Sequence, residues 1–259
     1  MQEFSPKTLV FACNWGGYAS ADLAGLGGIS YPPNVKILRV MCSARVDPIF
    51  VLEAFKNGSD GVLVVGCHPN YCHYIDGNIH AETRVKFLKT VLNQAGIDPK
   101  RLRVKWVSAS EGARFAEVVN NFVASLKTLG SSPLAGEKPD ANALASLVAA
   151  EEASADFRLR ALVGKEKKIV EEGNVYGERK PQSEFDNVMS DAVRAELTRH
   201  RIYLLVKSQP MSVKDLAKTM GLDPEKMLRH IAVMKRNGLV TVDRVEGTSP
   251  LYAALEARP

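Results

Sequence analysis

The strongest constraint on this chain is a strict alternation of short β-branched runs with helical patterns between residues 8 and 129. The runs have the length and composition of buried strands and occupy residues 8–12, 35–40, 61–65 and 102–107. A helical pattern follows each of them. Strands that alternate with helices form βαβ units with right-handed crossovers. The sequence therefore predicts a parallel sheet with helices on both faces.

The helical patterns have recognisable starts and ends. Asp47 and Ser110 are predicted to cap the helices that they precede. Pro48 suits a first helical turn, and Gly96 and Gly130 end the two later helices of the alternating region. The inner face of the helix after Pro48 is predicted to carry Phe50, Val51, Ala54 and Phe55.

Length, composition and charge limit the class of protein. The chain has 259 residues, of which 46% are hydrophobic and 24% charged, and these values exclude wholesale disorder and collagen-like sequence. Its longest apolar runs are strand-sized, so no membrane insertion is expected. The first seven residues lack the features of a secretory signal, which predicts a cytoplasmic protein. The net charge of +5 is too small to indicate a nucleic-acid or membrane partner.

Composition divides the chain into three predicted domains. Residues 130–139 form a cluster of helix and strand breakers, and residues 141–172 are rich in Ala, Glu, Lys and Leu, which favour helix. We therefore predict an α/β domain over residues 1–130, a linker with a helical segment over 131–183, and a third unit over 184–259.

The third unit has the element order of a winged helix-turn-helix. The predicted elements are helices over about residues 186–208, 213–220 and 224–237, then strands over 239–245 and 251–255. Ser212 caps the short helix, and a polar turn through Gly247 joins the two strands. Winged helices bind DNA in some proteins and dock on proteins in others.

Charge in the third unit favours protein docking over DNA. Its third helix carries Lys226, Arg229, His230, Lys235 and Arg236, which are residue types that contact DNA. The unit as a whole has 12 Lys and Arg against 10 Asp and Glu, a net charge of +2. DNA-binding modules usually carry a larger basic excess, because phosphate contacts dominate their affinity. DNA contact remains the alternative.

All four cysteines lie within the first 72 residues. Cys13, Cys42 and Cys67 stand just past the first three predicted strands, and Cys72 shares the loop of Cys67. The carboxyl ends of parallel strands meet at one edge of the sheet, where open α/β folds place their ligands. The four thiols are therefore expected to converge on a metal site.

Residue chemistry leaves the metal open between zinc and iron–sulfur. Four thiolates suit either one, and the absence of two Cys-x2–4-Cys pairs favours iron–sulfur only slightly. His68 and His73 are each directly adjacent to a cysteine, which makes joint ligation awkward. We expect both histidines to form hydrogen bonds around the site or to lie at the surface.

An ordered series of motifs runs through roughly residues 7–130. It comprises Cys13-Asn14-Trp15, Tyr18-Ala19-Ser20-Ala21-Asp22-Leu23-Ala24-Gly25, Tyr31-Pro32-Pro33, Arg39-Val40-Met41-Cys42-Ser43, Arg45-Val46-Asp47-Pro48, Asp60-Gly61-Val62, Gly66-Cys67-His68, Cys72-His73-Tyr74, Gly77-Asn78 and Ser108-Ala109-Ser110-Glu111-Gly112. This series resembles the delta subunit family of methyl-viologen-reducing hydrogenase.

The resemblance implies a cofactor and a role. Members of that family carry one [2Fe-2S] cluster and pass electrons from a donor enzyme to a heterodisulfide-reductase-type flavoprotein that bifurcates them. For this chain it implies Cys13, Cys42, Cys67 and Cys72 as ligands, with Asn14, Gly16, His68 and His73 beside them. The expected fold class is α/β with flavodoxin-like layering and an Fe-S site at the strand ends, followed by the helical linker and the winged helix-turn-helix.

The resemblance also implies partners. A heterodisulfide-reductase A-like flavoprotein subunit would accept the electrons, and a donor of the hydrogenase, formate dehydrogenase or NADH dehydrogenase type would supply them. The chain itself would be a non-catalytic electron-transfer subunit, for which nucleic acid is not an expected partner. The alternatives are a redox-sensing DNA-binding regulator and, behind both, a zinc-stabilised scaffold.

One position departs from the family pattern. The opening motif of the family resembles Cys-Asn-Trp-Cys, and Gly16 stands where its second cysteine would be. Four thiols remain, which is the number that a [2Fe-2S] cluster requires. A glycine here would also open backbone N–H groups to the cluster, which would raise its reduction potential.

Overall fold

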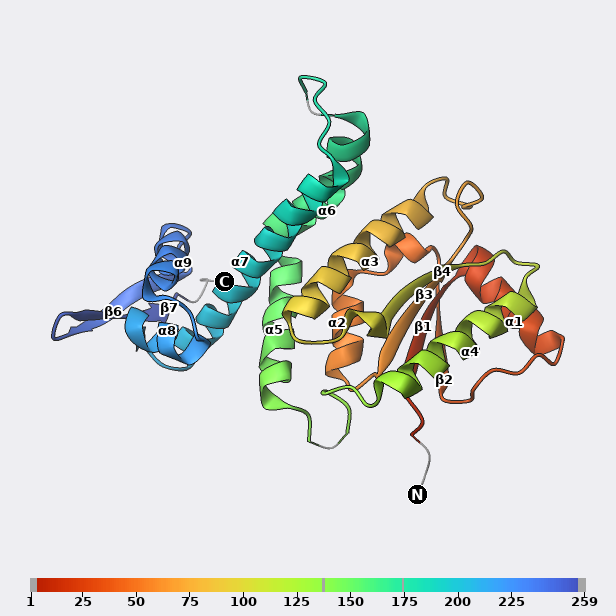
Figure 1. Ribbon diagram of the computed structural model, residues 1–259, viewed down its shortest axis with the longest axis horizontal. Helices are drawn as coiled ribbons and strands as arrows, with labels where there is room; N and C mark the ends of the chain where they lie inside the picture. Colours follow the sequence, from red (N-terminus) through yellow and green to blue (C-terminus); the bar gives the residue numbers. More distant parts are fainter. Residues whose placement is uncertain (1–3, 137, 174, 256–259) are drawn as a thin grey trace. The chain divides into compact units, whose positions relative to one another are not determined.

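The computed structural model describes residues 4–136, 138–173 and 175–255 (Figure 1). The chain divides into two compact units, Met1–Met189 and Ser190–Pro259. Of the helices within the described residues, none combines the length and the apolar character needed to cross a membrane.

The first unit is built on a four-stranded parallel sheet. Its strands are β1 (Thr8–Cys13), β2 (Val35–Val40), β3 (Gly61–Gly66) and β4 (Leu102–Trp106), in the spatial order β2-β1-β3-β4. β1 and β3 are central and almost wholly buried, which is why both are continuous apolar runs. The predicted parallel sheet is confirmed, and each predicted strand agrees with the observed one to within a residue at either end.

Helices cover both faces of this sheet, as predicted. They are α1 (Ala19–Leu26), α2 (Pro48–Lys56), α3 (Gly77–Gln94) and α4 (Gly112–Leu129). On one face, α1 and α4 pack on the two central strands through a core that includes Ala24, Phe115 and Phe122. The helices α2 and α3 lie on the other face (Figure 1). Gly61 permits close packing, because a Cβ there would lie 2.5 Å from a Leu126 methyl carbon.

Two predicted details of these helices are wrong. Phe50 was expected on the inner face of α2 but is 53% exposed, whereas Leu52 is fully buried. Leu52 and Phe55 lie three residues apart on one helical face, and Phe50 falls outside that face. Ser110 does not cap α4, because the helix begins two residues later and its N-cap position is Glu111. The predicted cap at Asp47 is confirmed: Ile49 N–H donates to Asp47 Oδ1 at 3.0 Å.

Two helices follow within the segment 131–183. α5 (Ala141–Ala155) and α6 (Phe157–Lys167) begin at Asp140 and Asp156, whose carboxylates accept backbone N–H groups. They belong to the first unit, where α5 packs against α2 and α3. Lys56 on α2 contacts Glu151 on α5 at 2.6 Å. Short helical turns lie at η1 (Asn14–Tyr18), η2 (Ser43–Arg45), η3 (Pro99–Arg101) and η4 (Lys168–Glu172).

The second unit is a winged helix-turn-helix, as predicted. Its elements are the later part of α7 (Gln182–Ser208), then β5 (Met211–Ser212), α8 (Val213–Met220), α9 (Pro224–Arg236), β6 (Val240–Glu246) and β7 (Ser249–Ala254). The strands form an antiparallel sheet in the order β5-β7-β6. The core joins Ile202, Leu216, Ile231 and Tyr252 from successive elements. The short strand β5 lies between two helices and was not predicted.

Candidate functional site

Three of the four cysteines lie at the carboxyl edge of the sheet. Cys13 is the last residue of β1, Cys67 directly follows β3, and Cys42 lies two residues past β2. All three side chains are buried, and Cys72 is half-buried. The central strand β1 pairs with both β2 and β3. Parallel pairing therefore brings these three thiols to one edge, as the sequence predicts.

The thiols are grouped as two pairs. The Sγ atoms of Cys13 and Cys67 lie 3.7 Å apart. Cys42 and Cys72 flank Gly77: a Cβ built on that glycine would lie 2.5 Å from Cys42 Sγ and 3.4 Å from Cys72 Sγ. Gly77 is the first residue of α3, so the absence of a side chain there leaves the space that both sulfur atoms use.

Three of the thiols have shifted pKa values, and the two thiols of the Cys13–Cys67 pair shift in opposite directions. A hydrogen bond with Cys67, together with backbone N–H donors, lowers the pKa of Cys13 to about 6, although burial opposes this shift. The same bond, in which the Cys67 thiol donates, raises the pKa of Cys67, and burial raises it further. Burial is also the main cause of the raised pKa of Cys42. Of Cys13, Cys42 and Cys67, Cys13 is therefore the one best prepared to act as a thiolate ligand near neutral pH.

The turn after Cys13 explains its stabilised thiolate. The segment η1 is a π-helical turn, and the N–H groups of Gly16 and Gly17 both donate to Cys13 Sγ at 3.3 Å. π-Helical turns are rare and occur often at functional sites. A Cβ at Gly16 would lie only 2.5 Å from the Val107 carbonyl oxygen and 3.3 Å from Cys67 Sγ. Backbone from three strand ends therefore closes around this glycine.

The residues expected beside the thiols are placed as follows. His68 Nε2 lies 2.7 Å from Glu111 Oε2, and Glu111 also accepts the N–H of Ser108 at 2.7 Å. These two bonds lower the pKa of Glu111. Asn14 opens η1 and is half-buried. His68 thus joins the loop after β3 to the loop after β4.

His73 joins two cysteine-bearing segments through aromatic stacking. Its ring lies over that of Trp15 with a centroid distance of 3.5 Å and an interplanar angle of 17°. Tyr74 packs edge-on against His73, at 4.9 Å. Trp15 follows Cys13 by two residues and His73 follows Cys72 directly. The stack therefore holds the loop of Cys72 against the turn of Cys13.

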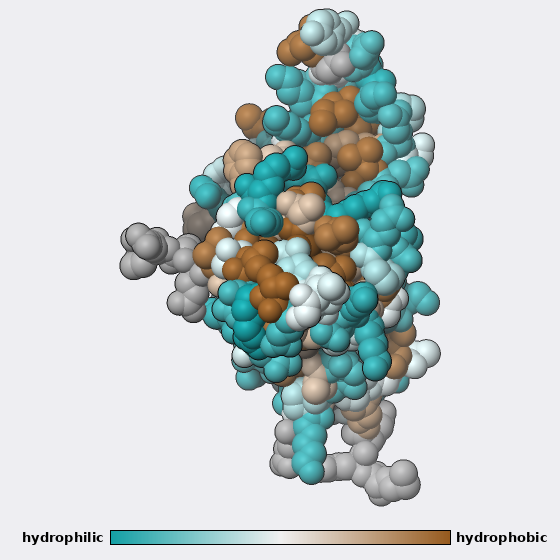
Figure 2. Space-filling model, turned by 90° about the vertical axis from the view of Figure 1, so that its left-hand side faces the viewer, coloured by the Kyte–Doolittle hydropathy of each residue, from teal (hydrophilic) through white to brown (hydrophobic). Residues whose placement is uncertain are grey.

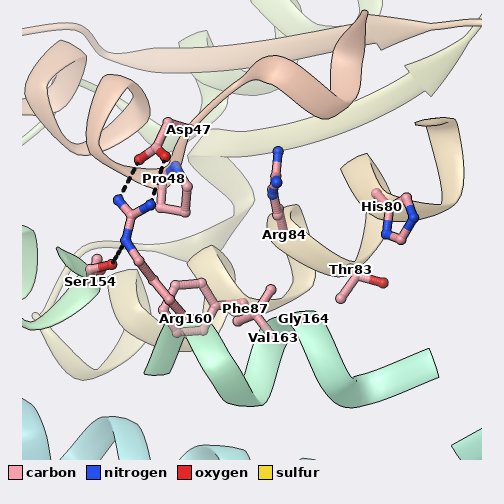
Figure 3. A pocket seen from close by; sticks show the side chains of 10 residues that line it. All are labelled: Asp47, Pro48, His80, Thr83, Arg84, Phe87, Ser154, Arg160, Val163 and Gly164. Carbon is pink, nitrogen blue, oxygen red and sulfur yellow. Dashed lines mark hydrogen bonds and ion pairs between the residues drawn. The ribbon is translucent and has the colours of Figure 1, made fainter. Parts of the chain in front are cut away.

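Two supporting residues were not predicted for these roles. Asn78 Nδ2 donates to the carbonyl oxygens of Cys67 at 3.3 Å and of His68 at 2.9 Å. Arg160 on α6 holds Asp47 through two 3.0 Å bonds and donates from Nε to the Ser154 carbonyl oxygen (Figure 3). Asn78 belongs to the Gly77-Asn78 motif of the sequence. Arg160 lies 113 residues from its partner and gives no local signal.

The described residues contain no group of three or more His, Cys, Asp or Glu side chains already arranged around a single metal ion. Tetrahedral thiolate bonds of about 2.3 Å place two sulfur atoms on one metal about 3.8 Å apart. The 3.7 Å separation of Cys13 and Cys67 fits that spacing. These two thiols can therefore share one metal ion without a change in their separation.

Comparison with known proteins gives two family matches. Residues 8–130 match the family described as "Methyl-viologen-reducing hydrogenase, delta subunit", and residues 195–243 match a helix-turn-helix domain. The first match covers the sheet and the thiols. The second covers α8, α9 and parts of α7 and β6.

Individual relatives are of two kinds. An iron-sulfur subunit of the F420-non-reducing hydrogenase from Archaeoglobus profundus is 50% identical over 129 residues, which cover 50% of this chain and 94% of the relative. The corresponding hydrogenase protein from Methanococcus voltae is 44% identical over 133 residues, or 51% of this chain and 92% of the relative.

The second kind is much longer than the matched region. One component of the ferredoxin/F420H2-dependent CoB-CoM heterodisulfide reductase from Methanosarcina acetivorans is 54% identical over 125 residues. These residues are 48% of this chain but only 16% of that relative. Sequences similar to this region thus occur both as nearly the whole of a relative and as a small part of a much longer one.

Proposed function

The chain belongs to the delta subunit family of methyl-viologen-reducing hydrogenase, and on this basis we propose that it is an electron-transfer subunit carrying a [2Fe-2S] cluster on Cys13, Cys42, Cys67 and Cys72. The observation that carries the proposal is the convergence of these thiols, in two pairs, at one edge of the sheet. Two pairs of thiols match the demand of a cluster with two irons, each of which takes two protein ligands. The hydrogenase relatives, which are named as iron-sulfur subunits, point in the same direction.

The residues around the thiols have definable tasks in such a site. The N–H groups of Gly16 and Gly17 would stabilise negative charge on Cys13 Sγ, and hydrogen bonds to sulfur ligands raise the reduction potential of a cluster. The Trp15–His73 stack would exclude water from one side. Asn78 would fix the backbone of the Cys67 loop. The bound cluster would supply reversible one-electron transfer.

The partners follow from the two kinds of relative. Because the names of these relatives describe hydrogenase and heterodisulfide reductase subunits, we propose that this chain relays electrons from a donor oxidoreductase to a heterodisulfide-reductase A-like flavoprotein that bifurcates them. The winged helix-turn-helix would dock the chain on a protein of that complex.

A redox-sensing DNA-binding regulator is the second candidate function. The helix-turn-helix match and the exposed side chains of Lys226, Lys235 and Arg236 on α9 favour it. Arg229 and Arg244 weaken it, because acidic neighbours on α9 and on the wing pair with them. Carboxylates at those two places would repel phosphate groups.

Anaerobic purification of the full chain tests the cluster. The expected protein is reddish-brown and contains about two irons and two acid-labile sulfides per chain. Replacing any one of the four cysteines by Ala should remove most of the iron, because one iron then lacks a protein ligand. His68→Ala and His73→Ala are the matched controls, since each alters a neighbour of a cysteine and should keep the iron. A colourless protein with one zinc would refute the proposal.

A further inference from the structure

A cavity of about 300 Å³ lies between the edge strand β4 and the helix α4, apart from the thiols. Its polar lining consists of Arg103 and Lys105 on β4 together with Arg114, Glu117 and Asn121 on α4. Leu63, Val118 and Phe122 supply an apolar floor. Its volume is at the lower end of the range for small-molecule sites, about 300–1,000 Å³.

The charges around this cavity are unbalanced. Three cationic side chains line it against one carboxylate. Within the described part of the chain, Arg103, Lys105 and Arg114 form no ion pair. Other cations of the same unit do have carboxylate partners: Lys56 contacts Glu151, and Arg160 contacts Asp47. The cavity therefore gathers three cations that have no described carboxylate partner within ion-pair distance.

Two of the cations are held in place. The Arg103 guanidinium lies 5.6 Å from the centre of the Phe122 ring, and Arg114 Nε donates to the Trp106 carbonyl oxygen at 3.3 Å. The cavity cations also act on a neighbouring lysine. Burial lowers the pKa of Lys89, and the positive charges of Arg103 and Lys105 lower it further. Positioned guanidinium groups with unused donors are typical of oxyanion recognition.

Protection of an edge strand does not account for the whole arrangement. Lysine and arginine on β4 discourage strand pairing with another chain. That role needs only Arg103 and Lys105, since Arg114 and Asn121 belong to α4. It also needs no hollow between the strand and the helix.

We propose that this cavity binds a small anion of the phosphate class with at least two negative charges. Arg103, Lys105 and Arg114 would bind its oxyanion groups, and the Asn121 amide would donate a further hydrogen bond. The Phe122 ring and Val118 would contact an apolar part of the ligand. The site uses none of the four cysteines, so it is independent of the metal centre.

The test is calorimetric titration of the full-length protein with inorganic pyrophosphate at low, constant ionic strength. We expect one binding site per chain. The double variant Arg103→Gln/Lys105→Gln should bind pyrophosphate at least tenfold more weakly than the wild type. The single variant Arg114→Gln should bind it about threefold more weakly. Added salt should weaken binding to the wild type, since screening acts on exposed charges.

The matched control is Lys36→Gln/Lys165→Gln, which removes the same charge from exposed positions on β2 and α6. It should bind pyrophosphate within twofold of the wild type. Equal far-UV circular dichroism and melting temperatures would establish that all variants fold. The proposal is overturned by absence of binding to the wild type, by equal weakening in both double variants, or by binding of polyglutamate without any binding of pyrophosphate.

Discussion

Gly16 shows how close backbone packing can exclude a side chain from a site. The resemblance implies a cysteine there, but in this chain a Cβ at the position would lie 2.5 Å from the Val107 carbonyl oxygen, closer than real Cβ contacts occur. A carbonyl oxygen in a strand connection cannot move as freely as the end of a side chain. A cysteine side chain at this position would therefore require the backbone to move, and in this chain the N–H of residue 16 donates to Cys13 Sγ.

Gly16→Ala should reduce the free energy of unfolding by about 1–3 kcal/mol, because the added methyl group overpacks a closed site. Urea denaturation of the metal-free protein measures the effect. Gly25→Ala is the control: it lies inside α1 with open space around it, so it should raise the free energy of unfolding by about 0.4–1 kcal/mol. Equal stability of Gly16→Ala and the wild type would mean that the backbone around residue 16 moves to accommodate the methyl group at little cost.

His230 makes the winged unit sensitive to acid. Burial lowers its pKa, the nearby Arg199 lowers it further, and Glu196 opposes these effects. The unfolded chain therefore takes up the proton first as the pH falls below about 6.5. Stability that is present above this pH is lost as the pH decreases toward the folded-state pKa.

A proton NMR titration of His230 should give a midpoint below about 6.5, the ordinary histidine value. Between pH 7 and pH 5, the melting temperature of the winged unit should fall more in the wild type than in His230→Gln, which cannot take up the proton. Identical pH profiles for the two proteins would contradict the assignment.

At the scale of elements, α6 supports the start of α2. Asp47 caps α2 with one oxygen and receives two bonds from Arg160, whose Nε is held by the carbonyl oxygen of Ser154 (Figure 3). The loop of Cys42 lies five residues before Asp47. The segment after the sheet domain therefore holds the residue that caps α2.

A double-mutant cycle measures this support. Asp47→Ala should cost about 1–2 kcal/mol, because it removes both a helix cap and an ion pair, and Arg160→Met should cost less than about 1 kcal/mol. The coupling energy should be about 0.5–1 kcal/mol. Asp140→Ala, which removes the cap of α5 alone, serves as the control and should cost about 1 kcal/mol. If the costs of Asp47→Ala and Arg160→Met simply add in the double variant, the ion pair contributes nothing to the free energy of unfolding.

At the scale of the whole molecule, the winged unit decides between a docking role and DNA-binding regulation. Large apolar side chains are exposed on it: Leu228 on α9 is 49% exposed, and Val245 on β6 is 62% exposed. Figure 2 shows apolar side chains at the surface between polar ones on the face that it draws. Exposed leucine and valine side chains favour a protein interface over DNA contact, because the buried core of a protein interface is apolar.

Leu228→Glu and Val245→Glu should weaken co-purification with the partner proteins at least tenfold while leaving the iron content unchanged, since every proposed ligand lies in the first unit. Lys226→Gln/Lys235→Gln should have little effect on that assembly. The comparison experiment is titration into mixed duplex DNA at two salt concentrations. Submicromolar, salt-sensitive DNA binding with an unaffected pull-down would favour the regulator instead.

The sequence by itself determined the elements and the general location of the thiols. Strand and helix periodicities depend on neighbouring residues, so β1 to β4 could be predicted closely. Parallel pairing then brings successive strand ends to one edge, which is why Cys13, Cys42 and Cys67 could be expected together. The cap at Asp47 is equally local and was also predicted.

Only the tertiary structure decided which groups face one another across distant segments. The division of the thiols into Cys13–Cys67 and Cys42–Cys72 depends on how the loop before α3 folds back, and no periodicity encodes that. Arg160 bonds to Asp47, and Arg103 lines the same cavity as Arg114. No local sequence pattern predicts either arrangement. Contacts of this kind arise because the packed sheet and helices fix side-chain positions that the chain's own propensities leave free.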